Sequence, residues 1–429
     1  MPFHARLLFT FLVRAALALG GLLLGLAARP LRAQPAPAAG VTLSGQVLDA
    51  RTRQPLSAAS VFLANTTYGT AADSAGRFTL VGVRPGQYEL VASYLGYQLA
   101  STPVALLQSA TRTVLLQPAG VQLDEVSVRP GKNNPADFRR FTRLFLGSST
   151  WSQQCRIENP EAVVVLYDKQ SQVLTAVAPQ GLQVLNPALG YRVTFHQFKF
   201  KVDYRAGQQE FAAAPSFTEL PAADARLGQH WQANRRRAYA GSLPHFLRSV
   251  RDNQLAATGF VVRRLLPLPD TEAARQRIAQ AADSLQQVLR PAPGVVALVY
   301  KQPLPAPQLR RADAATQRVW LRFPGAVQVS YQGEQPDAAY AAAQALGSSS
   351  FRVETVGNKG LSGQSGSVLG HATYTTQPEV SELQLLQPEV LVLPTGYLLN
   401  PLSIKVEGYW AFEKIGETLP LNYAPNTGQ

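Results

Sequence analysis

The segment from Leu43 to Gln117 alternates apolar with polar residues in short runs. In one run Phe78 and Leu80 are flanked by polar side chains, and Gly, Pro, Asp and Asn separate the runs. A period of two predicts strands that bury one face, and the separating residues predict turns. The segment therefore predicts an all-β sandwich. Its six expected strands are Leu43–Asp49, Ser60–Leu63, Gly76–Val83, Gln87–Tyr94, Gln98–Val104 and Thr111–Gln117.

Helical periodicity begins after Asn134, a typical N-cap, and Pro135, which suits the first turn of a helix. Phe138, Phe141 and Phe145 then recur at spacings of three and four residues, which places them on one face of a helix. Helical regions are predicted at about 135–146, 222–257 and, capped by Asp270, 271–290.

Alternation returns between and after these helices. The apolar parity shifts at His196-Gln197, which predicts a bulge, and Pro324-Gly325 is an expected turn between two strands. The predicted fold class is mainly β: an N-terminal β-sandwich, then an α+β region with a second β-rich domain carrying three or four helices. The expected strands of that region are Val163–Tyr167, Val173–Ala178, Tyr191–Tyr204, Val319–Phe323, Val327–Tyr331, Phe351–Val356, Val368–Thr375, Val390–Leu393 and Leu402–Val406.

The N-terminus has the pattern of a secretory signal peptide. Arg6 and Arg14 precede the apolar run Ala15–Ala28, and Ala33 provides a small residue for cleavage. The alternative is a membrane anchor, but this run of 14 residues is shorter than the ~20 that a spanning helix needs. We expect residues 1–33 to be removed and the Pro/Ala-rich residues 34–40 to form a disordered lead. The mature protein is then exported, to the periplasm or the outer membrane, with no transmembrane helix.

The charge of the chain limits its possible partners, and its cysteine count limits its possible disulfides. The net charge of +13 falls to +9 without residues 1–33, which carry four arginines and no acidic residue. Arg235, Arg236 and Arg237 are consecutive, so on a helix they spread around it and do not all face one cleft. An exported protein is not expected to bind nucleic acid, whereas acidic glycans or lipid head groups suit a basic surface. The single cysteine, Cys155, excludes an intramolecular disulfide and is expected to be a buried structural thiol.

The β segment resembles the carboxypeptidase-like regulatory domain, a transthyretin-like β-sandwich that is common in envelope proteins of Bacteroidota. The resemblance covers residues 41–128 and rests on spaced elements, among them Asp73-Ser74-Ala75-Gly76-Arg77-Phe78, Gly86-Gln87-Tyr88-Glu89-Leu90 and Gly96-Tyr97. Leu123–Val128 is similar to the segment that follows this domain in many TonB-dependent receptors. The resemblance implies an interaction or assembly module with a carbohydrate-binding-like fold and no peptidase residues. A linker is expected at 129–134.

The region 135–424 resembles an uncharacterised module that follows such sandwiches in exported Bacteroidota proteins. Because that module has no assigned activity, the resemblance implies no functional residue. The segments that carry it are Phe138–Phe141, Ile157–Glu161, Leu189–Tyr191, Tyr239–Ser249 and Glu407–Trp410.

The sequence contains no recognisable catalytic or metal-binding pattern. None of the five histidines is followed at the third position by Glu, as a zinc carboxypeptidase would require. Ser242 and His245 could form a nucleophile–base pair, but an N-cap serine with a first-turn histidine is the simpler interpretation. Gly363–Ser367 lacks the second glycine of a nucleophile elbow. We therefore expect no catalytic, cofactor-binding or metal-binding residues and no cofactor.

The sequence favours an exported, non-enzymatic envelope protein whose β-sandwich is an interaction or assembly module. Its partner is expected to be an envelope protein or a glycan, with peripheral association to the outer membrane compatible with the charge. The alternatives are an enzyme or glycan-binding protein with its site in the C-terminal module, where Trp231, Trp320 and Trp410 could line a cleft, or a small outer-membrane barrel.

Overall fold

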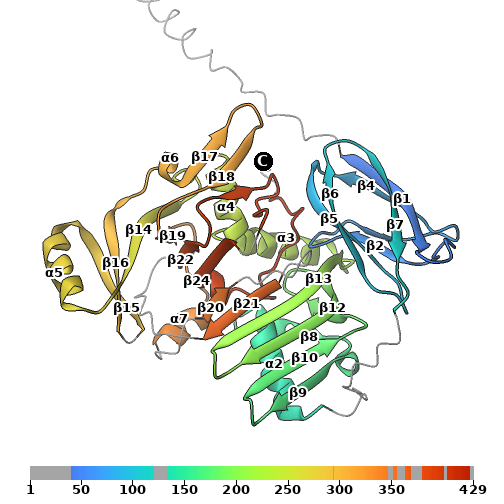
Figure 1. Cartoon of the computed structure of the whole chain (residues 1–429), viewed down its shortest axis with the longest axis horizontal. Helices are drawn as coiled ribbons and strands as arrows, with labels where there is room; N and C mark the ends of the chain where they lie inside the picture. The colour runs from blue at the N-terminus through green and yellow to red at the C-terminus, as the bar shows by residue number, and fades with distance from the viewer. Residues whose placement is uncertain are drawn as a thin grey trace, which may run out of the picture. The chain divides into compact units, whose positions relative to one another are not determined.

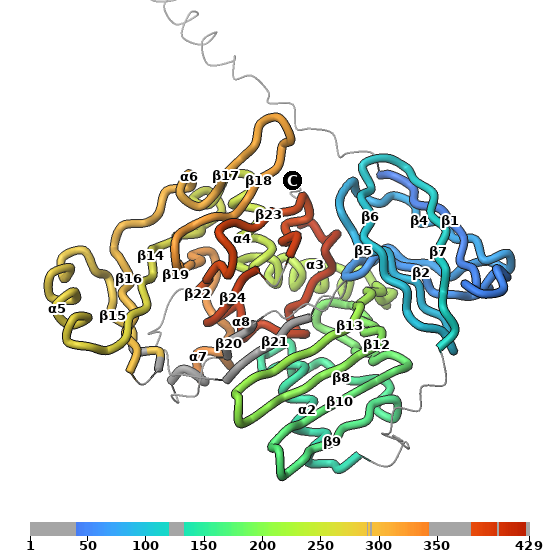
Figure 2. Tube along the Cα trace, viewed as in Figure 1, coloured from blue at the N-terminus to red at the C-terminus, as the bar shows by residue number. Residues whose placement is uncertain are grey.

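The computed structural model describes residues 40–119, 133–292, 294–345, 351–354, 363–368, 379–400 and 403–425 (Figures 1 and 2). Gly40–Gln429 is one compact unit. The predicted signal peptide at 1–33, the lead at 34–39 and most of the predicted linker lie outside the described residues. Within those ranges, no helix combines the length and the apolarity that crossing a membrane requires.

The first seven strands form the predicted β-sandwich. The order β4-β1-β7 makes one sheet and the order β3-β2-β5-β6 makes the other. All six strands predicted from the alternating pattern are confirmed, with ends that differ by at most two residues. The additional strand β3 has no apolar alternation that could have predicted it. The strands are β1 (Val41–Asp49), β2 (Ser60–Leu63), β3 (Gly69–Ala71), β4 (Arg77–Val83), β5 (Gly86–Ser93), β6 (Ala100–Leu106) and β7 (Ala110–Leu116).

The core between these two sheets contains the residues that the alternation places inside. Phe78 and Tyr88 are 3% and 6% exposed. Gly45 on β1 lies opposite Phe78 on β4, and a Cβ at Gly45 would stand 2.6 Å from the Phe78 ring. The same Cβ would stand 1.8 Å from the carbonyl oxygen of Arg112 on β7, so the β7 backbone and the Phe78 ring together require glycine there.

The C-terminal region is built on one long sheet. Its main path runs β15-β16-β14-β19-β22-β24-β20-β21-β13-β12-β10-β9, and a small separate sheet has the order β17-β18-β23. The strands are β8 (Arg156–Ile157), β9 (Val164–Asp168), β10 (Val173–Ala178), β11 (Leu182–Asn186), β12 (Tyr191–Asp203), β13 (Gln208–Glu219), β14 (Phe260–Pro269), β15 (Leu285–Ala292), β16 (Val295–Pro303), β17 (Arg310–Asp313), β18 (Arg318–Leu321), β19 (Ala326–Tyr331), β20 (Phe351–Glu354), β21 (Gly363–Val368), β22 (Glu379–Leu385), β23 (Val390–Val392) and β24 (Ile404–Gly408).

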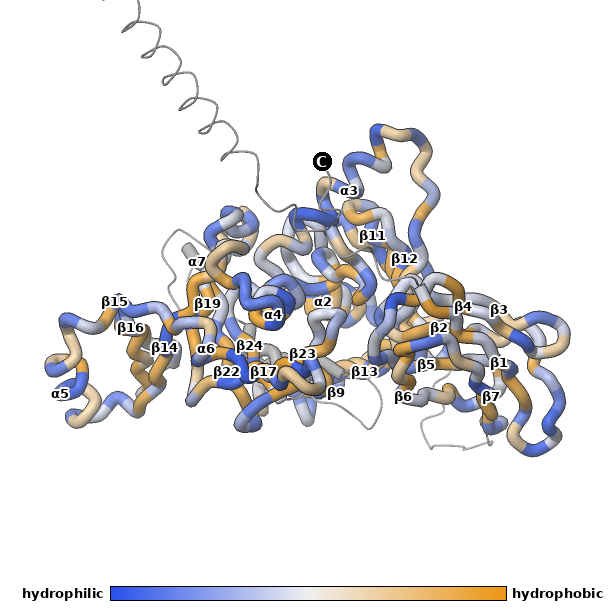
Figure 3. Tube along the Cα trace, turned by 90° about the horizontal axis from the view of Figure 1, so that it is seen from above, coloured by the Kyte–Doolittle hydropathy of each residue, from blue (hydrophilic) through white to orange (hydrophobic). Residues whose placement is uncertain are grey.

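Pairing of β13 with β21, with Gln209 opposite Gly366, joins the early strands of this region to the late ones. Strands β14, β16 and β19 are strongly apolar (Figure 3). The helices are α2 (Pro135–Leu146), α3 (Ala225–Tyr239), α4 (Leu243–Arg251), α5 (Glu272–Ala281), α6 (Ala306–Leu309), α7 (Ala338–Ala345) and α8 (Tyr409–Phe412).

Helix α2 forms as predicted, with Asn134 as N-cap and Gly147 as C-cap. The Asn134 side chain accepts hydrogen bonds from the first-turn backbone amides. Phe141 and Phe145 are buried and make edge-to-face contacts with phenylalanines of β12. The spacing of the phenylalanines therefore reports a packed helix face. The predicted bulge at His196-Gln197 is also confirmed, because the pairing of β12 with β13 shifts there.

The third helical region was predicted too long. Helix α5 ends at Ala281, and Leu285–Ala292 is strand β15, which pairs with β16. Leu285 and Leu289 are buried, and a spacing of four satisfies a period of two as well as a period of 3.6, so the pattern was ambiguous. The N-cap is Thr271, whose side chain accepts from the backbone amide of Ala274, rather than the predicted Asp270.

The region predicted as helical at 222–257 contains two helices, α3 and α4, and the predicted cap of the second helix by Ser242 is confirmed. The turn at Pro324-Gly325 exists, with a positive φ at Gly325, but the strands on either side do not pair with each other. Strand β18 pairs with β17 and β23, whereas β19 pairs with β14 and β22. A turn signal fixes a local bend and leaves the choice of partner to the sheet.

Candidate functional site

A cavity of about 230 Å³ lies among α3, α4, β13, β24 and the C-terminal segment. It is larger than the ~150 Å³ cavity that accommodates benzene in an engineered protein core. Its lining is mostly apolar and contains six aromatic side chains. The lining residues are Phe145, Gln209, Phe211, Ala238, Tyr239, Ser242, Leu243, Pro244, Leu247, Arg248, Gly396, Tyr397, Leu398, Ile404, Val406, Trp410, Glu413, Lys414, Ile415, Glu417, Thr418, Leu419, Pro420, Leu421 and Tyr423.

Two of the segments that the sequence singled out meet at this cavity. Tyr239–Ser249 forms the end of α3 and most of α4, and Glu407–Trp410 leads into α8. The indole Nε1 of Trp410 donates a hydrogen bond to the carbonyl oxygen of Gly241 at 2.7 Å. Phe246 on α4 and Trp410 are in ring contact at 5.3 Å. Gly241 and Trp410, which are 169 positions apart in the chain, therefore close one wall of the cavity together.

Ser242 and His245 do not form a nucleophile–base pair. The Ser242 hydroxyl donates to the carbonyl of Tyr239 at 2.7 Å and accepts from the backbone amide of His245, as an N-cap does. The His245 ring accepts from the backbone amide of Gly241 through Nδ1 and contacts the rings of Tyr239 and Phe260. Burial, reinforced by the nearby charge of Arg248, lowers the pKa of His245 to about 4. This histidine is a neutral packing residue.

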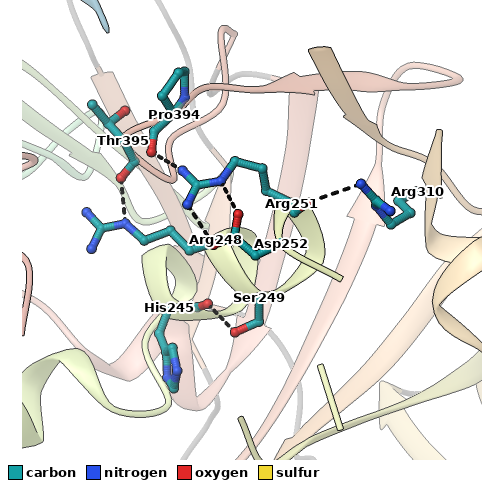
Figure 4. Close-up of polar contacts among 8 residues, drawn as sticks. All are labelled: His245, Arg248, Ser249, Arg251, Asp252, Arg310, Pro394 and Thr395. Atoms are coloured by element: carbon teal, nitrogen blue, oxygen red, sulfur yellow. Dashed lines mark hydrogen bonds and ion pairs between the residues drawn. The ribbon is translucent and has the colours of Figure 1, made fainter. Parts of the chain in front are cut away.

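Arg248 and Arg251 on α4 hold the loop that precedes β24 (Figure 4). The guanidinium of Arg248 donates to the carbonyl oxygens of Thr395, Leu421 and Tyr423 at 2.8, 3.1 and 3.0 Å. Arg251 donates to the carbonyl of Pro394 and to the carboxylate of Asp252. Both cations therefore bind backbone and neighbours, and Arg248 fixes the C-terminal wall of the cavity.

Two of the other charged lining residues also have protein partners. The Lys414 ammonium donates to the carbonyl oxygen of Leu144 at 3.1 Å, at the C-terminal end of α2, where a cation is favoured. Glu417 accepts from the Ser149 hydroxyl and from the backbone amide of Lys414. Glu413 differs, since within the described ranges no group donates a hydrogen bond to its carboxyl group. Glu413 and Glu417 were not anticipated from the sequence, where they follow the Glu407–Trp410 segment as scattered acids.

Burial is the largest influence on the pKa values of Glu413, Lys414 and Glu417 in the cavity wall. It raises the pKa of Glu417 to about 7, against the hydrogen bond from Ser149, and lowers the pKa of Lys414 to about 8. Burial and the charges of Glu379, Glu417 and Glu334 hold the pKa of Glu413 well above its usual range. Several carboxyl groups are thus close enough to oppose each other's ionisation.

Glu379 gives this cluster a measurable effect on stability. It is 5% exposed, and burial, then the charge of Glu334, raises its pKa from 4.5 to about 8. The folded state therefore holds a proton that the unfolded chain releases, and stability is lost as the pH rises from about 4.5 through 8. Glu379→Gln is expected to raise the free energy of unfolding at pH 8 by about 1–3 kcal/mol and to change it little at pH 5. Urea unfolding at both values tests this, with the exposed Glu161→Gln as control; an equal effect at both values would contradict it.

The other residues considered from the sequence lie away from the cavity. Arg236 and Arg237 are exposed, whereas Arg235 is buried, so the prediction that the three do not all face one cleft is confirmed. Of the three tryptophans proposed to line a cleft together, Trp410 alone lines this cavity. Cys155 is buried, and burial raises the pKa of its thiol to about 12. Among the described residues, no group of three or more His, Cys, Asp or Glu side chains is placed to hold a metal ion.

Helix α3 binds the loop between β11 and β12 through consecutive carbonyl groups. Trp231 donates to Pro187, Asn234 to Ala188, and Arg235 to Leu189 and Gly190. A Cβ at Gly190 would stand 2.3 Å from the Trp231 ring, and the φ of Gly190 is +69°. Both the close approach of the ring and the left-handed backbone therefore require glycine at this position. This explains why the Leu189–Tyr191 segment is distinctive, and its role is structural.

The turn after β2 contacts the wall of the cavity. The backbone amide of Leu421 donates to the carbonyl of Asn65 at 2.7 Å, and the Asn422 side chain bonds both the amide and the hydroxyl of Thr67. The Phe62 ring stacks on His196 with centroids 4.5 Å apart. Because Leu421 lines the cavity, the β-sandwich holds part of the cavity wall in place.

A family model of the CarboxypepD_reg-like domain matches residues 43–128. The resemblance seen in the sequence is thereby confirmed for this segment, and the N-terminal domain is a two-sheet β-sandwich. A comparison with curated proteins finds no match.

Solved structures similar to the chain are distant. The group B streptococcus pilus 2b backbone protein is 20% identical with a TM-score of 0.17, over 19% of this chain and 42% of that one. The shaft pilin SpaA of Lactobacillus rhamnosus GG is 17% identical with a TM-score of 0.17, over 19% and 48%. The 5-hydroxyisourate hydrolase of Klebsiella pneumoniae is 21% identical with a TM-score of 0.17, over 19% and 92%. The matched part of the chain spans less than half of the length of either pilin. At these levels of similarity, no activity of these proteins is transferred to this chain.

Proposed function

We propose that the chain is an exported, non-enzymatic binding protein of the cell envelope. In this proposal its β-sandwich is an interaction module, and its C-terminal region holds a small, largely apolar ligand. The observation that carries the proposal is the cavity of about 230 Å³, whose lining is aromatic and aliphatic with a few charged groups. Pockets of this composition are the usual sites of small-molecule binding.

The N-terminal pattern of Arg6 and Arg14 before an apolar run supports export. The contacts of Asn65 and Thr67 with the cavity wall support a role for the sandwich in the same function, since a partner on the sandwich could then influence the cavity. An enzymatic alternative would need a reactive group in the cavity, and Ser242, its one nucleophilic candidate from the sequence, is engaged as a helix cap.

A variant that fills the cavity tests the proposal. Val406 lines the cavity from β24, and Val406→Phe would place a ring in the empty space. We expect the neutral fluorescent probe N-phenyl-1-naphthylamine to bind the wild type and to lose at least about tenfold in affinity in the variant, which corresponds to roughly 1.4 kcal/mol. Thermal unfolding should show an unchanged or higher melting temperature, because the ring replaces a void.

Val165→Phe is the matched control. Val165 is buried in the core beneath α2 and does not line the cavity. The same substitution there should overpack the core and lower the free energy of unfolding by about 1–3 kcal/mol, with probe binding retained. Absence of probe binding to the wild type, or equal binding to Val406→Phe, would refute the proposed site.

A further inference from the structure

One ionisable side chain in the cavity wall, the carboxyl group of Glu413, accepts no hydrogen bond within the described residues. Four lining residues carry ionisable acids or strong bases: Arg248, Glu413, Lys414 and Glu417. Arg248 binds three backbone carbonyls, Lys414 binds the end of α2, and Glu417 accepts from Ser149 and a backbone amide. In the part of the chain that the structure describes, Glu413 alone among the four has no hydrogen-bond partner. Glu413 is half-buried and lines the cavity, so its carboxyl group can accept a hydrogen bond from a ligand there.

The charges around Glu413 favour a cation. Its electrostatic neighbours are the carboxyl groups of Glu379, Glu417 and Glu334, and no basic side chain offsets them. Lys414 follows Glu413 directly in the chain, but its ammonium group is bonded to the carbonyl of Leu144 on α2. The groups around the Glu413 carboxyl are acids that become negative when they ionise, so a positive ligand is favoured there over a carboxylate.

A second observation independently favours a cation. The cavity wall contains the rings of Phe145, Phe211, Tyr239, Tyr397, Trp410 and Tyr423. The faces of aromatic rings attract ammonium groups, and the attraction strengthens where water is excluded. The aliphatic residues of the lining, Leu247, Leu398 and Val406 among them, provide contact for an apolar body.

We propose that the cavity binds an organic ammonium cation with a compact apolar body, with its nitrogen on the Glu413 carboxylate and its hydrocarbon against the aromatic wall. This inference rests on the proposed binding function and names the ligand class of the same site.

Binding must displace a proton. In the free protein Glu413 is held in its neutral form by burial and by the surrounding carboxyl groups. An ammonium ion stabilises the carboxylate, so Glu413 releases its proton to solvent as the cation binds, and the charge of the site is unchanged. Affinity for the cation should therefore fall as the pH decreases.

Three ligands of similar size and different charge test the inference. Cyclohexylmethylamine, cyclohexylmethanol and cyclohexanecarboxylate carry a positive, neutral and negative group on the same ring. Isothermal titration calorimetry of the full mature chain at pH 7.5 should show that the amine binds at least about tenfold more tightly than the alcohol, as a charge-assisted hydrogen bond would allow. The carboxylate should bind most weakly of the three. Titration in two buffers of different ionisation enthalpy should show release of about one proton for each amine bound.

Glu413→Gln separates a binding role from a structural one. Glutamine matches the neutral acid in shape, so the variant should fold, and its melting temperature at pH 7.5 should be unchanged or higher because unfolding no longer releases the proton of Glu413. It should lose the preference for the amine and the proton release, and it should keep the affinity for the alcohol. Glu161→Gln, at an exposed position outside the cavity, should behave as the wild type.

The outcomes distinguish the two proposals. If the alcohol or the carboxylate binds as tightly as the amine, or if Glu413→Gln keeps the amine preference, the ammonium inference is overturned while a ligand cavity stands. If none of the three ligands binds and the neutral probe fails as well, both proposals are overturned.

Discussion

Replacing Phe78 with alanine is expected to lower the free energy of unfolding of the β-sandwich by about 3–5 kcal/mol. The ring is 3% exposed, belongs to the core between the two sheets and covers Gly45 on the neighbouring strand. Removal of the ring therefore leaves a cavity in the core, next to both β4 and β1. Hydrogen exchange of the β4 and β5 backbone amides in the full chain measures the change for this domain alone.

Val81→Ala is the control for Phe78, because Val81 lies on the same strand and is 69% exposed. Its effect should stay within about 0.5 kcal/mol. A loss below about 1 kcal/mol for Phe78→Ala would show that the ring does not belong to the core.

Replacing Arg235 with leucine is expected to cost about 2–4 kcal/mol. Its guanidinium donates to the carbonyls of Leu189 and Gly190, pairs with Glu219 at 3.1 Å and lies 4.0 Å from the centre of the Tyr191 ring. Leucine would leave two buried carbonyl oxygens without donors, at about 1–3 kcal/mol each, partly offset by apolar contact, and would remove the cation–π contact.

Arg236→Leu gives a matched comparison, since it removes the same charge from the next position of the same helix, where the side chain is exposed. Chemical unfolding followed by tryptophan fluorescence should show little change in the free energy of unfolding for Arg236→Leu. Equal destabilisation by the two variants would mean that the carbonyl contacts of Arg235 contribute nothing. The comparison also separates the buried member of the arginine cluster from Arg236 and Arg237, whose side chains are exposed.

The two candidate-site features differ in how far they could be predicted. The N-cap role of Ser242 follows from sequence alone, because a cap is a local interaction between a side chain and the amides two or three residues later. The cavity does not, because its wall combines α2, α3, α4, β13, β24 and the C-terminal segment. The sequence marked Tyr239–Ser249 and Glu407–Trp410 as distinctive without indicating that Trp410 bonds Gly241.

Glu413 illustrates the same limit for chemistry. In the sequence it is one of several single acids, and no spacing pattern distinguishes it. Its significance comes from burial and from three other carboxyl groups, contributed by segments near 334, 379 and 417. The start of a helix, in contrast, can be predicted from the sequence. The Asn134 side chain accepts hydrogen bonds from backbone amides only two and three residues later.

The sequence by itself determined the elements whose signals are local and unambiguous. These are the alternating strands of the β-sandwich, the capped helix at 135–146 and the bulge at His196-Gln197. The tertiary structure decided the elements for which the local pattern allowed two answers. Leu285 and Leu289 fit a helix or a strand, and pairing with β16 selected the strand because it satisfies their backbone groups and buries both side chains. It also decided which strands share a sheet and which distant side chains enclose the cavity, since both depend on contacts between residues far apart in the chain, which a periodic pattern does not encode.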